Sequence, residues 1–398
     1  MRAPVLVRAL FGAVAFMLAA AHPALSQADS TLAQGGIYDR PFIGSASSTS
    51  IGGYVEGNSN YFVDEGVTEG LSMELRRFNI FLFSAISPRV RFISELEFEH
   101  GTEEIALETA LVDVQIRPSF TLRAGILLPP IGYLNQNHDS PRWNWIDRPL
   151  VTTGIVPSTL SEVGFGAYGR GVMGSTIVSW DAYLTNGLSD GVISNATGRT
   201  DIPSGKSEES FGEDNNGSPA ISGRIGIRRP GLGEVGLSYY GARYNTDRLE
   251  GEPIDDPRRV EIAALDFGGA VGPLAVRGEF ALANIDVTTG LSELSGSRQW
   301  GGHLDLVAPV LRPRVLGYTN AVLEVGLRLE FVDFNVGSFS STGRPIRDDV
   351  AAVVPTLAYR PTPGTVFRGN YRYHWTRDFV GNPTSRMAGF QLGFATYF

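Results

Sequence analysis

The sequence predicts an all-β fold: a transmembrane antiparallel up-and-down β-barrel of about 16 strands, with an inward-folded constriction loop after strand 5. Three observations predict it. Short segments alternate between apolar and polar residues, the connections between them alternate between short and long, and a 35-residue irregular segment interrupts the series. No stretch after residue 26 contains 18 consecutive apolar residues, so no membrane-spanning helix is predicted.

The first 47 residues are expected to lie outside the barrel. Arg2 and Arg8 precede an apolar run too short to span a bilayer, and Ala24 and Ser26 offer the small residues of a cleavage site. We therefore expect a signal peptide at 1–26, a short periplasmic N-terminal segment with little structure at 27–47, and the barrel at 48–398. Removal of the signal peptide, with Arg2 and Arg8, would change the formal charge of the chain from −9 to −11. This negative charge argues against nucleic acid as a partner. The absence of cysteine suits an exported protein assembled without disulfides.

Sixteen segments have the composition and alternation of strands. In the third, for example, Phe92, Leu96 and Phe98 lie opposite Arg91 and Glu95. The tenth and fourteenth segments alternate poorly. The expected strands are at 48–62, 73–86, 90–99, 106–117, 120–127, 163–170, 172–185, 220–228, 233–244, 258–270, 274–284, 300–308, 318–333, 349–359, 365–375 and 387–398.

The connections between these segments differ in length in a regular way. Strands 2 and 3 are separated by three residues and strands 6 and 7 by Gly171 alone, whereas 128–162 and 186–219 are long. Outer-membrane barrels have short turns on one side and long loops on the other, with both termini on the short-turn side. A soluble β-sandwich has no reason to keep this phase.

The last strand has its own signal. Phe390, Leu392, Phe394, Thr396 and Phe398 share one face, and the chain ends on an aromatic residue. This arrangement is similar to the usual assembly signal of outer-membrane barrels. The alternative is an ordinary amphipathic strand that happens to end in Phe.

The segment 128–162 is irregular but is not a solvated linker. Its five prolines forbid a helix interior or a central strand, while Trp143, Trp145 and a row of aliphatic residues favour burial. We expect it to fold into the lumen and narrow a pore. The residues expected to line the pore or its constriction are Arg77, Arg91, Glu95, Glu97, Arg123, Asn135, His138, Asp139, Arg142, Asp147 and Arg148.

The charges expected on the lumen face have both signs. Rings of arginine favour anions in a pore and rings of carboxylates favour cations, so the mixture leaves the ion preference open. Equally, many of these arginines and glutamates could pair across neighbouring strands and stiffen the wall.

The region around the loop resembles the phosphate-selective porin O/P family. The similar elements are Gly125, Pro129, Gly132, the run 135–141 with His138 and Asp139, the run 148–151, Pro157, and the run 162–166. The resemblance implies a 16-stranded passive channel, a homotrimer with this loop in its lumen, and anions such as phosphate among the candidate solutes. The chain departs from the phosphate-selective members in three ways: it is acidic, Lys206 is its one lysine, and no arginine-rich ladder follows the loop.

The leading hypothesis is an outer-membrane porin of a Gram-negative bacterium that passes small hydrophilic solutes or ions by diffusion. Its expected surroundings are outer-membrane lipid and lipopolysaccharide. The alternative is a closed structural or surface-binding barrel without transport. A hydrolase is disfavoured. His138, Asp139 and Ser140 are adjacent in sequence, but adjacency does not itself make a catalytic triad, because the members of a triad are brought together by folding. No metal-ligand cluster, P-loop or dinucleotide motif occurs, and no cofactor is expected.

Overall fold

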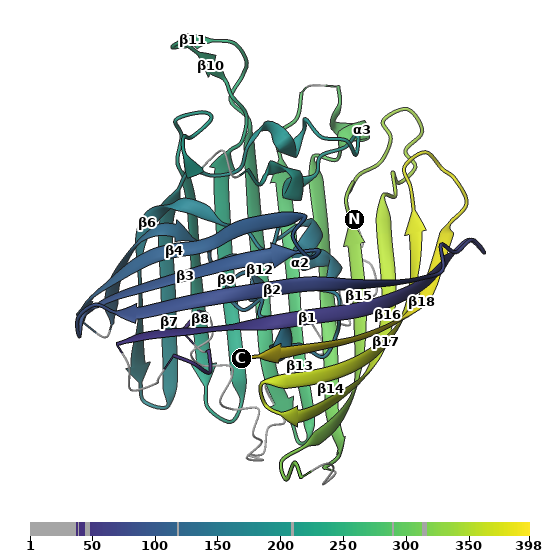
Figure 1. Cartoon of the computed structure of the whole chain (residues 1–398). Coiled ribbons are helices and arrows are strands. Elements are labelled where there is room, and N and C mark those ends of the chain that lie inside the picture. The colour runs from purple at the N-terminus through teal and green to yellow at the C-terminus, as the bar shows by residue number, and fades with distance from the viewer. Residues whose placement is uncertain are drawn as a thin grey trace.

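Sixteen antiparallel strands close into a barrel in the computed structural model, which describes residues 37–38, 40–43, 48–117, 119–207, 211–288, 290–312 and 317–398. Each barrel strand pairs with its neighbour in the chain, and β1 pairs with both β2 and β18, which closes the ring (Figure 1). The predicted fold class and strand number are confirmed. The predicted signal peptide lies outside the described residues.

The barrel strands agree with the predicted segments to within a few residues. The tenth and fourteenth segments, which alternate poorly, are strands as well (β12 and β16). The strands of the barrel are β1 (Thr49–Asp64), β2 (Leu71–Ala85), β3 (Val90–Glu99), β4 (Glu104–Arg117), β5 (Phe120–Leu127), β6 (Glu162–Met173), β7 (Thr176–Thr185), β8 (Ala220–Arg229), β9 (Gly233–Arg243), β12 (Arg259–Val271), β13 (Leu274–Ile285), β14 (Arg298–Leu311), β15 (Val322–Asp333), β16 (Asp349–Thr362), β17 (Thr365–Arg377) and β18 (Ser385–Tyr397).

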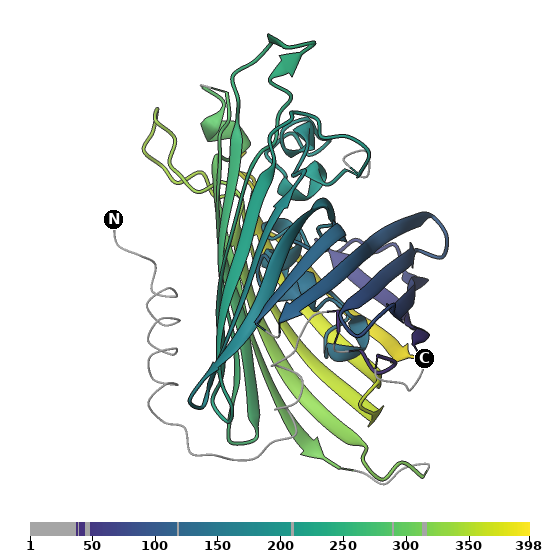
Figure 2. The ribbon, with the colours of Figure 1, turned by 90° about the vertical axis from the view of Figure 1, so that its left-hand side faces the viewer.

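Most connections follow the predicted alternation, and Figure 2 shows the long loops at one end of the barrel and the short turns at the other. Two connections depart from it: the one between β3 and β4 is short for the long-loop end, and the one between β14 and β15 is long for the short-turn end. The turn predicted at Gly171 is wrong: Met173 pairs with Thr176, and the turn is formed by Gly174 and Ser175. A two-residue hairpin of this kind needs a positive φ, which Gly174 adopts at +61°. One long loop adds a hairpin that was not predicted, β10 (Arg248–Leu249) with β11 (Glu252–Pro253), which stands beyond the barrel (Figure 1).

The outer wall carries large apolar side chains. In β18, Phe390 and Leu392 are 61% and 63% exposed, whereas Gln391 between them is 3% exposed and faces the lumen. This alternation is what a barrel wall in lipid requires. None of the helices in the described part of the chain is long and apolar enough to cross a membrane.

The lumen has two unlike sides. On the side of β9, β12 and β13, near the long loops, the inward side chains are apolar and many are alanines. They pack against the loop after β5 and against the loop after β7 to form one cluster, which we call the apolar cluster. Its members are Ile131, Val151, Ile155, Val156, Leu160, Leu188, Val192, Ile202, Ala220, Tyr240, Ala242, Tyr244, Val260, Ile262, Ala264, Ala281, Ala283, Ile285 and Val332. On the side of β1 to β4 and β17, the inward side chains are mostly polar, and many of them are charged.

Candidate functional site: the charged side of the lumen

The loop between β5 and β6 reaches strands on opposite sides of the barrel. Its backbone N–H groups donate to inward-facing side chains: Gly132 to Ser238 Oγ of β9 at 2.8 Å, and Ile146 to Asn370 Oδ1 of β17 at 2.8 Å. Leu150 N donates to Glu330 Oε1 of β15 at 3.0 Å. A buried segment without regular structure leaves its backbone groups unpaired unless side chains satisfy them. The polar residues of the wall do so here.

Within the loop, side chains make hydrogen bonds to backbone groups that a helix or a sheet would otherwise pair. Asn135 is 1% exposed and joins the two ends of the loop: its Nδ2 donates to the carbonyl oxygens of Pro129 and Leu160 at 2.8 and 3.1 Å, and its Oδ1 accepts from Leu160 N at 2.7 Å. Short 3-10 turns at Leu134–Gln136 and Ser140–Arg142 and one helix, α2 (Leu150–Gly154), fill the space between. Trp145 is 4% exposed, as its residue type predicts, and its Nε1 donates to Val354 O at 2.8 Å.

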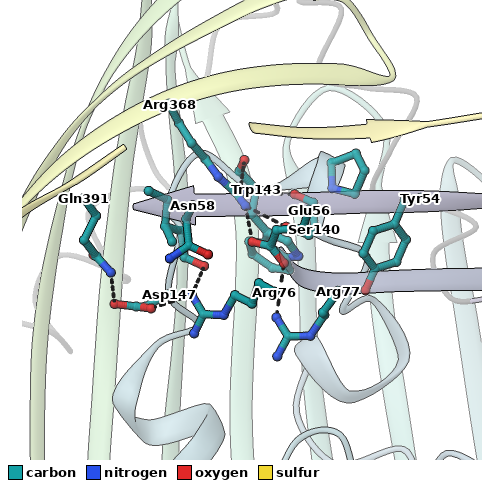
Figure 3. A network of polar contacts seen from close by, with 12 residues as sticks. Tyr54, Glu56, Asn58, Arg76, Arg77, Ser140, Trp143, Asp147, Arg368 and Gln391 are labelled. Atoms are coloured by element: carbon teal, nitrogen blue, oxygen red, sulfur yellow. Dashed lines mark hydrogen bonds and ion pairs between the residues drawn. The ribbon is translucent and has the colours of Figure 1, made fainter. Parts of the chain in front are cut away.

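The loop is also bound to the charged side of the wall. Arg368 of β17 donates through Nη2 to Glu56 Oε1 of β1 and to Ser140 Oγ of the loop, both at 2.6 Å. Arg77 donates to the other oxygen of Glu56 at 3.2 Å. Figure 3 shows Glu56 between these two arginines, with Ser140 and Trp143 of the loop beside them. Because Arg368, Glu56 and Ser140 are buried, the network fixes the loop against β1 and β17.

A second set of ion pairs surrounds Asp147, at the other end of this network (Figure 3). Its carboxylate accepts from Arg76 at 2.8 Å, from Arg372 at 3.4 Å and from Gln391 at 2.9 Å. Burial alone would raise the pKa of Asp147, but Arg76 and Arg372 outweigh burial and hold the pKa below its usual range. Asp147 is therefore charged at neutral pH and joins β2, β17 and β18 to the loop.

Two lumen charges were missed because each is the extra residue of a β-bulge. The register between β1 and β2 shifts after Glu56, so that Arg76 and Arg77 both face the lumen. The register between β3 and β4 shifts after Glu95, which turns Glu108 inward, where it is 8% exposed. Strict two-residue alternation assigns both residues to the lipid side. A charged side chain on the lipid side of a barrel is destabilising, so an arginine or a glutamate that strict alternation assigns to that side indicates a β-bulge.

A cavity of about 390 Å³ lies on this side of the lumen, beside the apolar cluster. It opens near the long loops, since Lys206 of the loop after β7 and Glu104 at the first residue of β4 contribute to its wall. Loop residues Asp147, Arg148 and Thr153 border it as well. Its lining is Arg76, Arg77, Glu97, Glu99, Glu104, Glu108, Asp147, Arg148, Leu150, Thr153, Ser158, Thr159, Lys206, Arg372 and His374. A separate small pocket of about 10 Å³, room for roughly one water molecule, lies beside Ser140 and Trp143 and shares Arg77, Asp147 and Arg148 with the lining of the cavity.

Apart from Asn135, which joins the two ends of the loop, the predicted constriction residues fall into three groups. Four of them, Arg77, Glu97, Asp147 and Arg148, border the cavity. Glu95, His138 and Asp139 are buried beside it, and Arg142 donates to Tyr397 Oη at 3.0 Å nearby.

The third group lies nearer the short turns. Arg123 makes a two-point ion pair with Asp113 at 2.8 and 2.7 Å, and Arg91 donates to Gln115 at 3.3 Å. Asp113 and Arg91 are opposite each other on β3 and β4, close to where β3 begins. These residues are therefore separated along the barrel axis from the cavity.

The N-terminal segment supplies a residue that sequence reasoning did not find. Arg40 is 4% exposed and lies between the wall and the loop, where its Nη2 is 2.6 Å from Glu95 Oε2 and 3.0 Å from Asp139 Oδ1. Glu95, His138 and Asp139 each place one oxygen or nitrogen within 4.8 Å of the others, a spacing that a metal ion could use. The guanidinium of Arg40 already supplies positive charge to two of the three. The geometry therefore favours an organic cation over a metal ion at this place.

No family model matches the chain, so membership of the phosphate-selective porin O/P family stays a prediction. A protein of Aquifex aeolicus (strain VF5), described as uncharacterized, is 32% identical over 198 residues, which are 48% of this chain. The match spans 43% of the length of that relative.

Solved structures of outer-membrane porins share the fold. The channel DcaP of Acinetobacter baumannii is 12% identical, with a TM-score of 0.55 over 88% of this chain and 97% of its own. An anion-selective porin from Comamonas acidovorans is also 12% identical, with a TM-score of 0.54 over 88% of this chain and 99% of its own. OmpT of Vibrio cholerae in its trimer form is 10% identical, with a TM-score of 0.53 over 88% of this chain and 100% of its own. The chain therefore has the porin fold, a closed 16-strand barrel.

Proposed function

We propose that the chain is an outer-membrane porin, a passive channel whose solute path runs along the charged side of the lumen. The observation that carries this proposal is the cavity of about 390 Å³, open near the long loops and lined by charged side chains of both signs. A wall that served stability alone would be filled by apolar side chains, as the opposite side of the lumen is.

The loop between β5 and β6 is the proposed constriction. Its charged residues Asp147 and Arg148 border the cavity, and Ser140, which Arg368 binds together with Glu56, lines the small pocket next to it. Because the cavity lining balances basic and acidic groups, we propose small hydrophilic solutes and ions of either sign rather than phosphate alone. The predicted signal peptide, an outer-membrane location and a homotrimer belong to the same proposal.

The channel hypothesis can be tested by labelling single introduced cysteines, because the chain contains no cysteine of its own. Thr153→Cys places a thiol at the cavity, and Leu237→Cys, at a side chain 61% exposed on the outer wall, is the matched control. In planar bilayers, a charged thiol reagent should lower the single-channel conductance of Thr153→Cys and leave that of Leu237→Cys unchanged. Equal responses of the two variants would contradict the proposed path.

A closed structural or surface-binding barrel is the second candidate, and one observation favours it: the loop after β5 is hydrogen-bonded to β9, β15 and β17, strands on opposite sides of the lumen. The same bilayer experiment separates the two. Discrete current steps from the wild-type protein support the channel. No steps, even after deletion of 135–149, would leave the closed barrel as the better account.

A further inference from the structure

The described residues of the N-terminal segment, which was expected outside the barrel with little structure, lie inside it. Ile37 is 6% exposed and packs among apolar side chains of β3 to β5, and Tyr38 donates its hydroxyl to Asp113 of β4. Phe42 stacks on Phe81 of β2, with ring centroids 5.6 Å apart and an interplanar angle of 20°. Three side chains thus bind the segment to the wall, and Arg40 lies between them in sequence.

Arg40 is held by hydrogen bonds, ion pairs and a cation–π contact. Its Nε and Nη2 donate to the two oxygens of Asp139 at 3.1 and 3.0 Å, which is the two-point fork typical of arginine and carboxylate. Nη2 also donates to Glu95 at 2.6 Å. The guanidinium carbon lies 3.6 Å from the ring centroid of Phe81, in cation–π contact. An ammonium group cannot reproduce the planar fork.

The surroundings of Arg40 contain more carboxylates than Arg40 neutralises. Asn79 Nδ2 donates to Glu95 and to Glu97 at 2.7 and 2.6 Å, so these two glutamates lie side by side. Glu108 Oε2 has no hydrogen-bond partner among the described residues, and it lies 3.8 Å from the ring of His138. Without the guanidinium, Glu95 would keep only the imidazole of His138, at 3.4 Å, and Asp139 only Arg142 Nε, at 3.9 Å, as ion-pair partners.

Glu97 and Glu108 also connect this group to the cavity, because both line it. Along the barrel axis, the order is therefore the long-loop mouth, the cavity, Glu97 with Glu108, and then Glu95 with Asp139. A cation that enters the cavity meets carboxylates that continue toward the seat of Arg40.

We propose that the seat formed by Glu95, Asp139 and Phe81 is a guanidinium-binding site: it holds Arg40 in the wild-type chain, and it binds alkylguanidinium solutes when the Arg40 side chain is absent. Free arginine and related guanidinium compounds are the chemical class. The inference rests on the proposed channel for access, but the site itself can be tested without transport.

The test uses Arg40→Ala, which empties the seat, and methylguanidinium chloride as the probe. The apparent Tm of the purified variant in detergent should rise by several degrees with methylguanidinium and not with equal concentrations of methylammonium chloride. The wild-type protein, whose seat is filled, should respond equally to both salts. If Arg40→Ala fails to fold in buffer, refolding that needs methylguanidinium is the same result in another form.

A matched variant locates the effect. Arg40→Ala combined with Asp139→Asn lacks the fork, and its response to methylguanidinium should vanish. An unchanged response of this double variant, or equal shifts with the two salts in Arg40→Ala, would overturn the site.

Recordings in planar bilayers test whether the site lies on the solute path of the channel. L-arginine should reduce the KCl current through Arg40→Ala at concentrations about tenfold lower than L-lysine, because only the guanidinium forms the fork. If a current is observed and L-arginine and L-lysine reduce it at the same concentrations, the binding site is rejected and the proposal of a channel is retained. A methylguanidinium effect on Tm without any current would support the site and reject the channel.

Discussion

The two sides of the lumen use the same wall in opposite ways. On the side of β9, β12 and β13, alanines leave room for Val151 and Ile155 of the loop, and the interior is a packed core. On the side of β2, β3 and β17, bulky charged side chains pair with one another and border a cavity. In this barrel, the loop after β5 packs in an apolar core on one side of the lumen, and a polar cavity remains on the other side. Helix α2 lies at the boundary, and substitutions on it test the comparison most directly.

The largest effect is expected from a charge placed in the packed side. Val151 of α2 is fully buried, and Val151→Asp would leave a carboxylate without a partner among apolar side chains. We expect a loss of about 4–5 kcal/mol in the free energy of unfolding, measured by denaturation in detergent. Thr153→Asp, two residues along the same helix at the cavity, is the control and should cost under about 1 kcal/mol. Similar losses in both variants would remove the distinction between the two sides.

A smaller loss is expected from breaking the network between the loop and the wall. Arg368→Met would leave the buried Glu56 with Arg77 as its remaining cation. Removal of one partner from a buried ion pair costs about 3–5 kcal/mol, and we expect the lower end because Arg77 stays. Arg76→Met breaks a pair whose side chains are 21% and 26% exposed, so under about 1 kcal/mol is expected. Denaturation of the two variants side by side checks the difference.

Selectivity should change only on the charged side. Asp147→Asn removes a negative charge from the cavity wall, and Arg76→Gln removes a positive one. Under a KCl gradient, we expect the reversal potential to shift toward anions in the first variant and toward cations in the second. Val151→Ala, on the packed side, should leave it unchanged. Shifts of the same sign in both charge variants would place the current elsewhere.

The smallest effect is a pH dependence at His138. Burial lowers the pKa of this imidazole, but Glu95 and then Glu108 oppose burial, Arg148 adds a lowering contribution, and the net pKa is raised above 6.5. A raised pKa means that protonated His138 stabilises the fold fully below pH 6.5, and that this stabilisation is lost as pH rises through the folded pKa. The wild-type Tm should therefore fall more between pH 6 and pH 9 than that of His138→Gln. Parallel pH profiles would exclude the contribution.

Much of the fold could be predicted from residue order alone. Each strand presents one face to lipid and one to the lumen, so its alternation is a local property, and the lengths of the turns are visible in the chain. The prediction was wrong at Gly171, where a glycine inside a strand resembles a turn; the real turn uses Gly174, whose φ is positive. Arg76 and Glu108 were missed because a bulge is a mismatch between two strands and is absent from either strand alone.

The sequence by itself determined the class, the number of strands, their inner and outer faces, and a buried loop after the fifth strand, because these follow from short-range patterns in water and lipid. Only the tertiary structure decided which part of that loop packs and which part borders a cavity. It also decided that Arg40 lies between Glu95 and Asp139, residues 55 and 99 positions away. The reason is physical: contacts at such separations depend on the closure and register of the whole barrel, which no local pattern records.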